Sequence, residues 1–178
     1  MKLKISKLLL ESALIFHARN DVRYYLNGIC FMHDGRIAST DGHRAFIGGS
    51  HDNTLTENVI IKIGKSPTKR YDYAIIDTKS KIATYHDEDG VIVGSGICEE
   101  IDGRFPDIDR VIPKRTLPTE EIGFNAGYLV DIEKVAKLFN PRFCGVKFEL
   151  NGNTDAAVGC LSAPSGETAK IVVMPMRL

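Results

Sequence analysis

The stretch ISKLLLESALIFHA at residues 5–18 decides the fold that this sequence predicts. Its apolar residues fall at helical spacing on one face, and Ser6 stands where a side chain that caps a helix is expected. The other face carries Lys7, Glu11 and His17. We expect an amphipathic helix that packs one face on a sheet and exposes the other.

The same arrangement returns near the end of the chain. Ile122-Gly123-Phe124 is expected to form a short strand, and Asn125 is expected to cap a helix that runs to Asn140-Pro141. Three predicted strands follow each helix: 23–32, 36–40 and 44–48 after the first, and 146–150, 156–161 and 169–174 after the second. The sequence therefore predicts an α+β fold of two strand-helix-three-strand halves, with both helices packed on antiparallel sheets.

An insert made only of strands is expected between the halves. Its predicted strands are 59–63, 71–76, 81–85 and 91–97, separated by turn residues. The segment 112–118 contains two prolines and has the composition of an extended connector. We place a boundary near Lys114, which divides the chain into residues 1–113 and 114–178 within one compact unit.

The length, charge balance and composition of the sequence exclude some classes of protein. The 178 residues suit one domain, and 23 basic side chains balance 23 acidic ones. No apolar run approaches membrane-spanning length and the start does not resemble a signal peptide, so a cytoplasmic protein without a membrane partner is expected. Cysteines with no paired spacing predict reduced core thiols: Cys30, Cys98, Cys144 and Cys160. We predict no metal site and no cofactor.

The terminal stretch 171–178, IVVMPMRL, is expected to be a buried strand that ends at a proline. Pro175 cannot donate a hydrogen bond to a sheet, so pairing should stop there. Met174 and Met176 then have two interpretations. They line an adaptable apolar groove, or they fill gaps in the core.

Asp41, His43 and Arg44 could form an acid, a base and an anion-binding group. The same residues fit a turn between two strands, and no phosphate-binding loop or metal-spaced carboxylates accompany them. A small phosphate hydrolase is therefore a remote alternative, and no catalytic residue is predicted.

Basic residues on and near the two predicted helices could face double-stranded DNA. The candidates are Lys4, Lys7, Arg19, Lys134 and Lys137. Acidic residues share these helix faces, so a solvated surface of mixed charge is the other interpretation, and the more favoured one on charge alone. Any contact with DNA would be to phosphates and would weaken with salt.

Several short motifs resemble the bacterial sliding clamp, the beta subunit of DNA polymerase III. In chain order they are RYYLNG at 23–28, TDGHR at 40–44, DGRFPD at 102–107, RVIP at 110–113, IGFN at 122–125 and VVMPMRL at 172–178. The resemblance covers nearly the whole chain, which is about half as long as the three-domain subunit of that family. Residues 1–113 resemble its middle domain, with a loop around 65–69 in place of the second helix. Residues 114–178 resemble the second half of its third domain.

The resemblance implies a groove that binds short peptide motifs of DNA polymerases, the clamp loader and repair proteins. Ala45 and Val158 depart from the side chains usual in that groove. Carried over to this chain, the groove comprises Leu26, Thr40, Gly42, His43, Arg44, Ala45, Pro106, Arg110, Val111, Val158, Val172, Val173, Met174, Pro175, Met176 and Arg177.

Two uses of such a groove stay open. In the first, the protein forms a homo-oligomeric ring around DNA and tethers a polymerase as a processivity factor in DNA replication. In the second, it is a clamp-like module that does not encircle DNA and competes for the partners of the full-length clamp. Neither use requires an enzyme activity in this chain.

Overall fold

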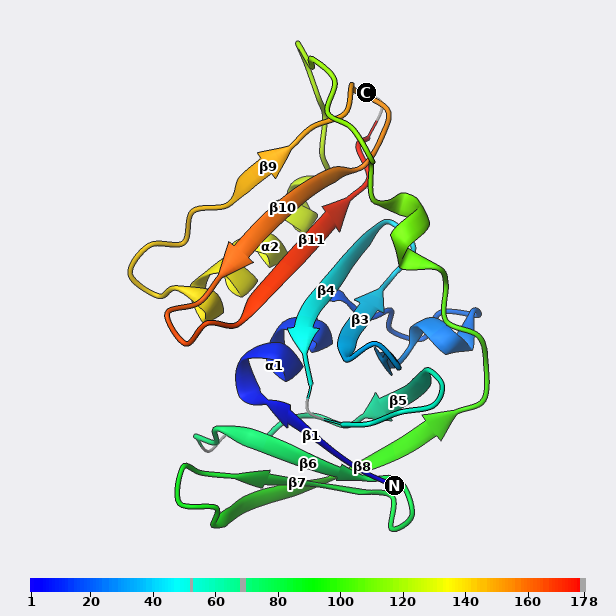
Figure 1. Ribbon diagram of the computed structural model, residues 1–178, viewed down its shortest axis with the longest axis vertical. Coiled ribbons are helices and arrows are strands. Elements are labelled where there is room, and N and C mark those ends of the chain that lie inside the picture. Colours follow the sequence, from blue (N-terminus) through cyan, green and yellow to red (C-terminus); the bar gives the residue numbers. More distant parts are fainter. Residues whose placement is uncertain (52, 68–69, 177–178) are drawn as a thin grey trace.

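The computed structural model describes residues 1–51, 53–67 and 70–176, apart from the side chain of Ser50. Its strands form one antiparallel sheet of eleven, in the order β1-β6-β7-β8-β5-β2-β3-β4-β11-β10-β9 (Figure 1). The elements are β1 (Lys2–Ser6), α1 (Lys7–Phe16), η1 (Tyr24–Leu26), β2 (Ile29–Phe31), β3 (Arg36–Thr40), β4 (Arg44–Ser50), β5 (Val59–Ile63), β6 (Tyr73–Asp77), β7 (Ile82–His86), β8 (Ile92–Ile101), η2 (Ile108–Val111), α2 (Ala126–Phe139), β9 (Lys147–Glu149), β10 (Ala157–Ser162) and β11 (Thr168–Val173).

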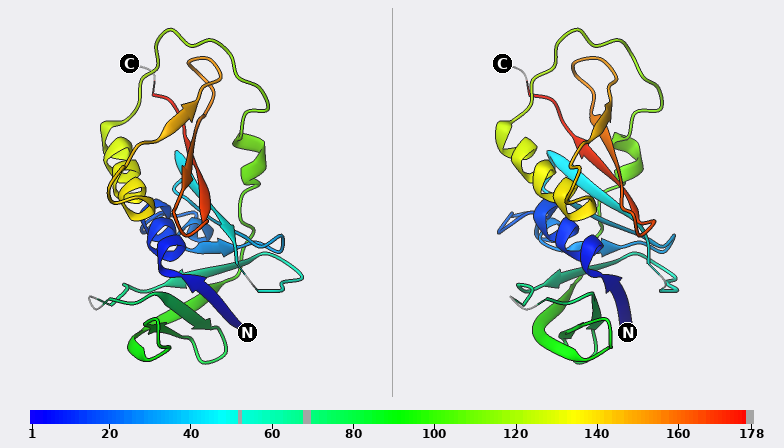
Figure 2. Two further views of the ribbon diagram at one scale, coloured as in Figure 1. Left: turned by 60° about the vertical axis from the view of Figure 1, so that its left-hand side comes forward. Right: turned by 90° about the vertical axis from the view of Figure 1, so that its left-hand side faces the viewer.

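The two helices lie side by side on one face of the sheet (Figure 2). Both begin at the capping residues expected from sequence. The Ser6 hydroxyl accepts the Leu9 N–H at 3.3 Å, and the Asn125 amide oxygen accepts the Gly127 N–H at 2.8 Å. Each cap satisfies a backbone donor that has no partner within its helix.

One aromatic side chain joins the two helices to the sheet. Phe46 of β4 is fully buried, and its ring centre lies 6.2 Å from that of Phe16 in α1 and 6.4 Å from that of Phe139 in α2. The pairing of β4 with β11, in which Ala45 is opposite Val172, also joins the first half of the chain to the second. The halves therefore share one hydrophobic core.

A second hydrophobic cluster covers the opposite face of the central strands. Ala45 and Ile47 flank Phe46 in β4 and point to this second face, as the two-residue period of a strand requires. Phe105 and Ile108 of the segment after β8 pack on it. That segment crosses the sheet on the side away from the helices (Figure 2).

Two predicted strands are wrong in whole or in part. Residues 23–32 were expected to be one strand, but only Ile29–Phe31 form β2, and Tyr24–Leu26 form a 3₁₀ turn. Side-chain hydrogen bonds close this turn: Asn27 accepts the Asp21 N–H and donates to the Asp21 carbonyl, each at 2.9 Å. Residues 122–124 form no strand either. The boundary proposed near Lys114 falls between η2 and α2 and stays a prediction.

The insert follows β4 and contains β5 to β8, as expected. The loop between β5 and β6 contains no helix in its described residues. Tyr71 covers the sheet there, with its ring 4.9 Å from that of buried Tyr85 and its hydroxyl 2.6 Å from the Glu11 carboxylate. One ring thus connects the insert to α1.

Two of the four predicted core thiols are wrong. Cys30 and Cys98 are buried, and burial raises the pKa of Cys30 to about 12. Cys160 is exposed because it occupies an outward position of β10, and exposed Cys144 lies in the irregular segment before β9. Among the described residues, no helix has the length and hydropathy needed to cross a membrane.

Candidate functional site

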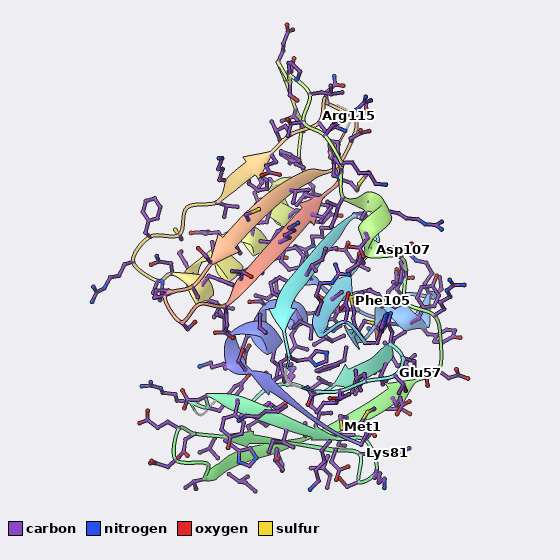
Figure 3. All side chains as sticks on the ribbon, in the orientation of Figure 1. Met1, Glu57, Lys81, Phe105, Asp107 and Arg115 are labelled. Atoms are coloured by element: carbon purple, nitrogen blue, oxygen red, sulfur yellow. The ribbon has the colours of Figure 1, made fainter. Side chains whose placement is uncertain are left out.

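A pocket of about 230 Å³ lies where η1, the β3–β4 turn, η2 and the end of β11 meet. Four stretches that are far apart in the sequence contribute its walls. Figure 3 labels Phe105 and Asp107 on the segment that forms one side. The pocket is lined by Arg23, Tyr25, Leu26, Thr40, Gly42, His43, Arg44, Ala45, Pro106, Asp107, Ile108, Val111, Val172 and Met174.

The β3–β4 turn is held by its own side chains. The Thr40 hydroxyl donates to the Arg44 carbonyl at 2.7 Å and accepts the Gly42 N–H at 3.0 Å. One oxygen of Asp41 accepts the backbone N–H groups of His43 and Arg44 at 2.9 and 3.1 Å. Gly42 has φ +94°, a conformation that favours glycine. Thr40, Asp41 and Gly42 thus fix the shape of the turn.

These bonds leave no acid and base pair at the turn. Asp41 uses its second oxygen to accept from Arg44 Nε at 3.0 Å, and the His43 ring stacks on the Tyr128 ring at 6.4 Å. In the part of the chain that the structure describes, no hydrogen bond joins the Asp41 carboxylate to the His43 ring. The geometry gives Asp41 a structural role and lends no support to the hydrolase alternative.

Arg44 connects the turn to both helices. Its guanidinium donates to Asp131 of α2 at 2.7 Å and to the Ile15 carbonyl of α1 at 3.4 Å. It lies 4.8 Å from the ring centre of Phe16 and 4.8 Å from that of Tyr128, and only 10% of the side chain is exposed. Arg44 therefore fixes the wall of the pocket by hydrogen bonds and cation–π contacts.

The acidic partner of Arg44 is held in its charged form. Burial acts to raise the pKa of Asp131, but hydrogen bonds from Lys134 and Arg44 outweigh it and lower the pKa below its ordinary value. On the far side of the pocket, hydrogen bonds from Arg23 lower the pKa of Asp21 to about 2. Both carboxylates are charged at neutral pH.

The chain after β11 has two methionines in different positions. Met174 donates its N–H to the His43 carbonyl at 2.9 Å, is 38% exposed and lines the pocket. Met176 donates its N–H to the Gly123 carbonyl at 2.7 Å, is 49% exposed and lies outside the pocket lining. Pairing with β10 ends at Val173, as the proline predicts. Neither methionine is a buried core residue.

The structure brings ten of the sixteen predicted groove residues together. Those in the pocket lining are Leu26, Thr40, Gly42, His43, Arg44, Ala45, Pro106, Val111, Val172 and Met174.

Of the other six, five lie outside the pocket lining. Val173 is fully buried in the core shared with the helices, because it alternates with Val172 along β11. Val158 is opposite Val172 on β10 and lines a different cavity beside residues 112–116. The Arg110 side chain is 84% exposed and pairs with Asp107 at 3.0 Å. Pro175 and Met176 continue beyond the pocket, and Arg177 lies outside the described residues.

Sequence reasoning missed four residues of the pocket lining: Arg23, Tyr25, Asp107 and Ile108. All four belong to motifs that had been singled out or adjoin one, so the signal was present. Arg23 is absent from the groove that the resemblance implies, although Leu26 of the same motif is part of it. In the structure Arg23 donates to the Asp41 carbonyl at 3.1 Å, and the Gly42 position packs against it.

The five candidate DNA-facing cations have different surroundings. Lys134 and Lys137 pair with Asp131 and Glu133 at 2.6 and 2.5 Å. Lys4 lies 4.4 Å from the ring centre of Tyr73 and Lys7 lies 5.3 Å from that of Tyr71, while Arg19 is exposed. Glu133 thus offsets the charge of Lys137, whereas Lys134 shares the single Asp131 carboxylate with Arg44. Within the described ranges, no group of three or more His, Cys, Asp or Glu side chains could hold a metal ion.

Comparison with curated proteins finds beta sliding clamps. The chain is 31% identical to the beta sliding clamp of Proteus mirabilis over 157 residues, covering 81% of this chain and 41% of that protein. It is 29% identical to that of Salmonella typhimurium over 165 residues, covering 83% of this chain and 42% of that protein. The chain thus spans less than half the length of these relatives. No family model matches it.

Solved structures show the same fold. The DNA polymerase III subunit beta of Pseudomonas aeruginosa superposes with a TM-score of 0.66 and 20% identity, over 100% of this chain and 67% of that one. A sliding clamp of Bartonella birtlesii bound to griselimycin gives a TM-score of 0.67 and 20% identity, over 99% of this chain and 66% of that one. The chain therefore resembles the bacterial beta sliding clamp in sequence over most of its length and has the sliding-clamp fold.

Proposed function

We propose that this protein is a sliding-clamp-like accessory protein of DNA replication that acts in the cytoplasm. In this proposal the pocket of about 230 Å³ binds the clamp-binding peptide motifs of DNA polymerases, clamp-loader subunits or repair proteins. The protein performs no reaction itself. It raises the local concentration of the partner that it holds.

The observation that supports this proposal is the composition of the pocket. Leu26, Ala45 and Val172 form an apolar floor, and Val111 and Met174 are partly exposed at its sides. Apolar pockets with a few polar groups at the edge suit short peptides with large hydrophobic side chains. A peptide with the hydrophobic clamp-binding motif is expected to bind at micromolar strength, about −8 kcal/mol.

The two methionines provide an internal test. Met174→Ala should weaken binding of that peptide about tenfold, because it removes apolar contact from the pocket. Met176→Ala should change the affinity less than about twofold, because its side chain lies outside the lining. Isothermal titration calorimetry measures both, with melting curves to check the fold. The proposal would be overturned if both variants lost affinity equally, or if the wild type bound no peptide at millimolar concentration.

A second candidate keeps the groove but does not encircle DNA, so that the protein competes for the partners of the full-length clamp. The ion pair of Lys137 with Glu133 favours it, because a cation already paired attracts phosphates weakly. Gel filtration of the protein with circular or linear double-stranded DNA separates the candidates. Retention on closed circular DNA but not on linear DNA supports the tethering form, and absence of retention on either supports the competing module.

A further inference from the structure

A second cavity, of about 310 Å³, lies between the extended segment 112–116 and the strands β9, β10 and β11. Figure 3 labels Arg115 on this segment. Hydrogen bonds hold the segment in place at its far end: Leu117 donates its N–H to the Leu150 carbonyl at 3.3 Å and accepts the Gly152 N–H at 3.5 Å. The cavity is therefore formed by fixed backbone, and its volume is at the lower end of the range of small-molecule sites, about 300–1,000 Å³.

Three cations line this cavity without a partner of their own. Within the residues that the structure describes, no ion pair or side-chain hydrogen bond involves Lys114, Arg115 or Lys170. Asp109 lies on the same side of the sheet, but two hydrogen bonds from Arg36 bind it and lower its pKa most, and Lys170 contributes least to that shift. The three cations are thus available to an anion such as a phosphate group.

A buried polar group at the same cavity lacks a partner. Asn151, in the turn between β9 and β10, lines the cavity and is only 7% exposed. Its amide nitrogen donates to the Asp155 carboxylate, so the opposite orientation of the amide would place two oxygens together. Its amide oxygen has no hydrogen-bond partner in the described part of the chain. Because an unsatisfied buried acceptor is costly, a ligand that donates an O–H or N–H to this oxygen is favoured.

The carboxylate of Glu149 adds a further requirement. Glu149 is opposite Val158 in the ladder of β9 with β10, and both residues line the cavity. A carboxylate repels a phosphate, but it accepts hydrogen bonds from sugar hydroxyls, as it does in nucleotide sites. A ligand that fits all of these groups has a phosphate at one end and hydroxyl donors at the other.

We propose that this cavity binds a small phosphate ester that carries hydroxyl groups, as a sugar phosphate or a nucleotide does. Lys114, Arg115 and Lys170 bind the phosphate, and Asn151 and Glu149 accept hydrogen bonds from the hydroxyls. The cavity shares no lining residue with the pocket of about 230 Å³, so the site is independent of the proposed function.

Titration of the full chain at low salt, followed by ¹H–¹⁵N NMR, tests the site with ribose 5-phosphate, AMP and inorganic phosphate. Both esters should shift the amide signals of 114–116, 149–151 and Lys170, and should bind at least about tenfold more tightly than inorganic phosphate, which is too small to reach the cations and Asn151 together. Equal affinities for the two esters identify the sugar phosphate as the recognised unit, and tighter binding of AMP identifies a nucleotide. The proposal is overturned if neither ester shifts these signals at millimolar concentration, or if inorganic phosphate binds as tightly as the esters.

Two lysines on the same face of the sheet provide a matched pair of variants. Lys170 and Lys147 are both exposed and lie opposite Cys160 from its two sides, but only Lys170 lines the cavity. Lys170→Gln should weaken binding of the esters about tenfold, because it removes one of three cations. Lys147→Gln should change the affinity less than about twofold. Equal losses in the two variants would show a general attraction of charge and would overturn the proposal.

Removal of the unpartnered acceptor gives a second test. Asn151→Leu should lower the affinity for the esters to that for inorganic phosphate, because the hydroxyl loses its acceptor. Melting curves show whether the turn still folds, and the two lysine variants decide the question if it does not. A folded Asn151→Leu variant that binds the esters like the wild type would also overturn the proposal.

Discussion

Two stretches of this chain each precede the cap of a helix, but only one of them forms a strand. Residues 2–6 precede α1 and form β1, which pairs along its whole length with β6. Residues 122–124 precede α2 and form no strand, although their sequence is as apolar. The difference lies in the partner: the insert supplies β6 to the first half, and no strand in the described ranges lies beside 122–124. Strand formation here depends on the neighbour more than on local propensity.

The largest loss of unfolding free energy is expected at Phe46, whose ring packs against both helices. Phe46→Ala removes the ring between Phe16 and Phe139 and should cost about 3–5 kcal/mol of unfolding free energy. Urea denaturation followed by circular dichroism measures this loss. Phe143 is exposed, so the control variant Phe143→Ala should unfold with a free energy within about 0.5 kcal/mol of the wild type. A single transition in both proteins is expected. Two separate transitions would show that the halves have independent cores.

Truncation to alanine at equivalent positions before the two helix caps should lower the unfolding free energy by unequal amounts. Leu3, three residues before Ser6, is 1% exposed, so Leu3→Ala should cost about 2–5 kcal/mol. Ile122, three residues before Asn125, is only half-buried, and Ile122→Ala should cost less than about 1 kcal/mol. The same urea experiment compares them. Equal losses would mean that 122–124 packs as firmly as β1.

A smaller loss of stability is expected at the β1 edge of the sheet, where the Asn53 side chain bonds both backbone groups of Lys4. Asn53→Ala removes two hydrogen bonds to Lys4 and should lower the unfolding free energy by about 1 kcal/mol. It should also speed hydrogen exchange of the Lys4 amide. Thr54→Ala, at the exposed next position, is the control. Unchanged exchange at Lys4 would show that Asn53 does not protect the edge.

The smallest effect is a pH dependence at the contact between the halves. The pKa of Asp131 is lowered in the folded state, so its stabilising contribution is present above the ordinary carboxyl pKa of about 3.9 and is lost as pH falls through the lower folded value. The melting temperatures of wild type and Asp131→Asn should therefore differ at pH 7, and the difference should shrink progressively as pH falls below about 4. The exposed pair of Glu133 with Lys137 makes Glu133→Gln a control with almost no effect. A gap that persists at low pH would contradict the assignment to Asp131.

The sequence predicted both helices and their caps because Ser6 and Asn125 act locally. It predicted the last nine strands within a few residues for the same reason, since turns and alternating apolar residues are local signals. The turn at 24–26 escaped because Asn27 closes it onto Asp21, a contact that strand propensity ignores.

The groove was predicted less completely than the fold. The resemblance identified the turn at 40–44 and Met174, but it placed Val172 and Val173 on the same surface. In a strand, neighbouring residues face opposite sides, and only the register of β11 with β4 shows that Val172 belongs to the pocket side. Arg23 and Ile108 reach the pocket through the path of loops, which no spacing in the sequence encodes.

The contacts of Arg44 have a consequence for the kinetics of ligand binding. Because its guanidinium is held by Asp41, Asp131 and the Ile15 carbonyl, the turn that walls the pocket is already ordered before any ligand arrives. A ligand then loses little affinity to the entropic cost of ordering that turn. Association should accordingly proceed in a single step at a rate set by diffusion and orientation, without a slow rearrangement of the 40–44 turn.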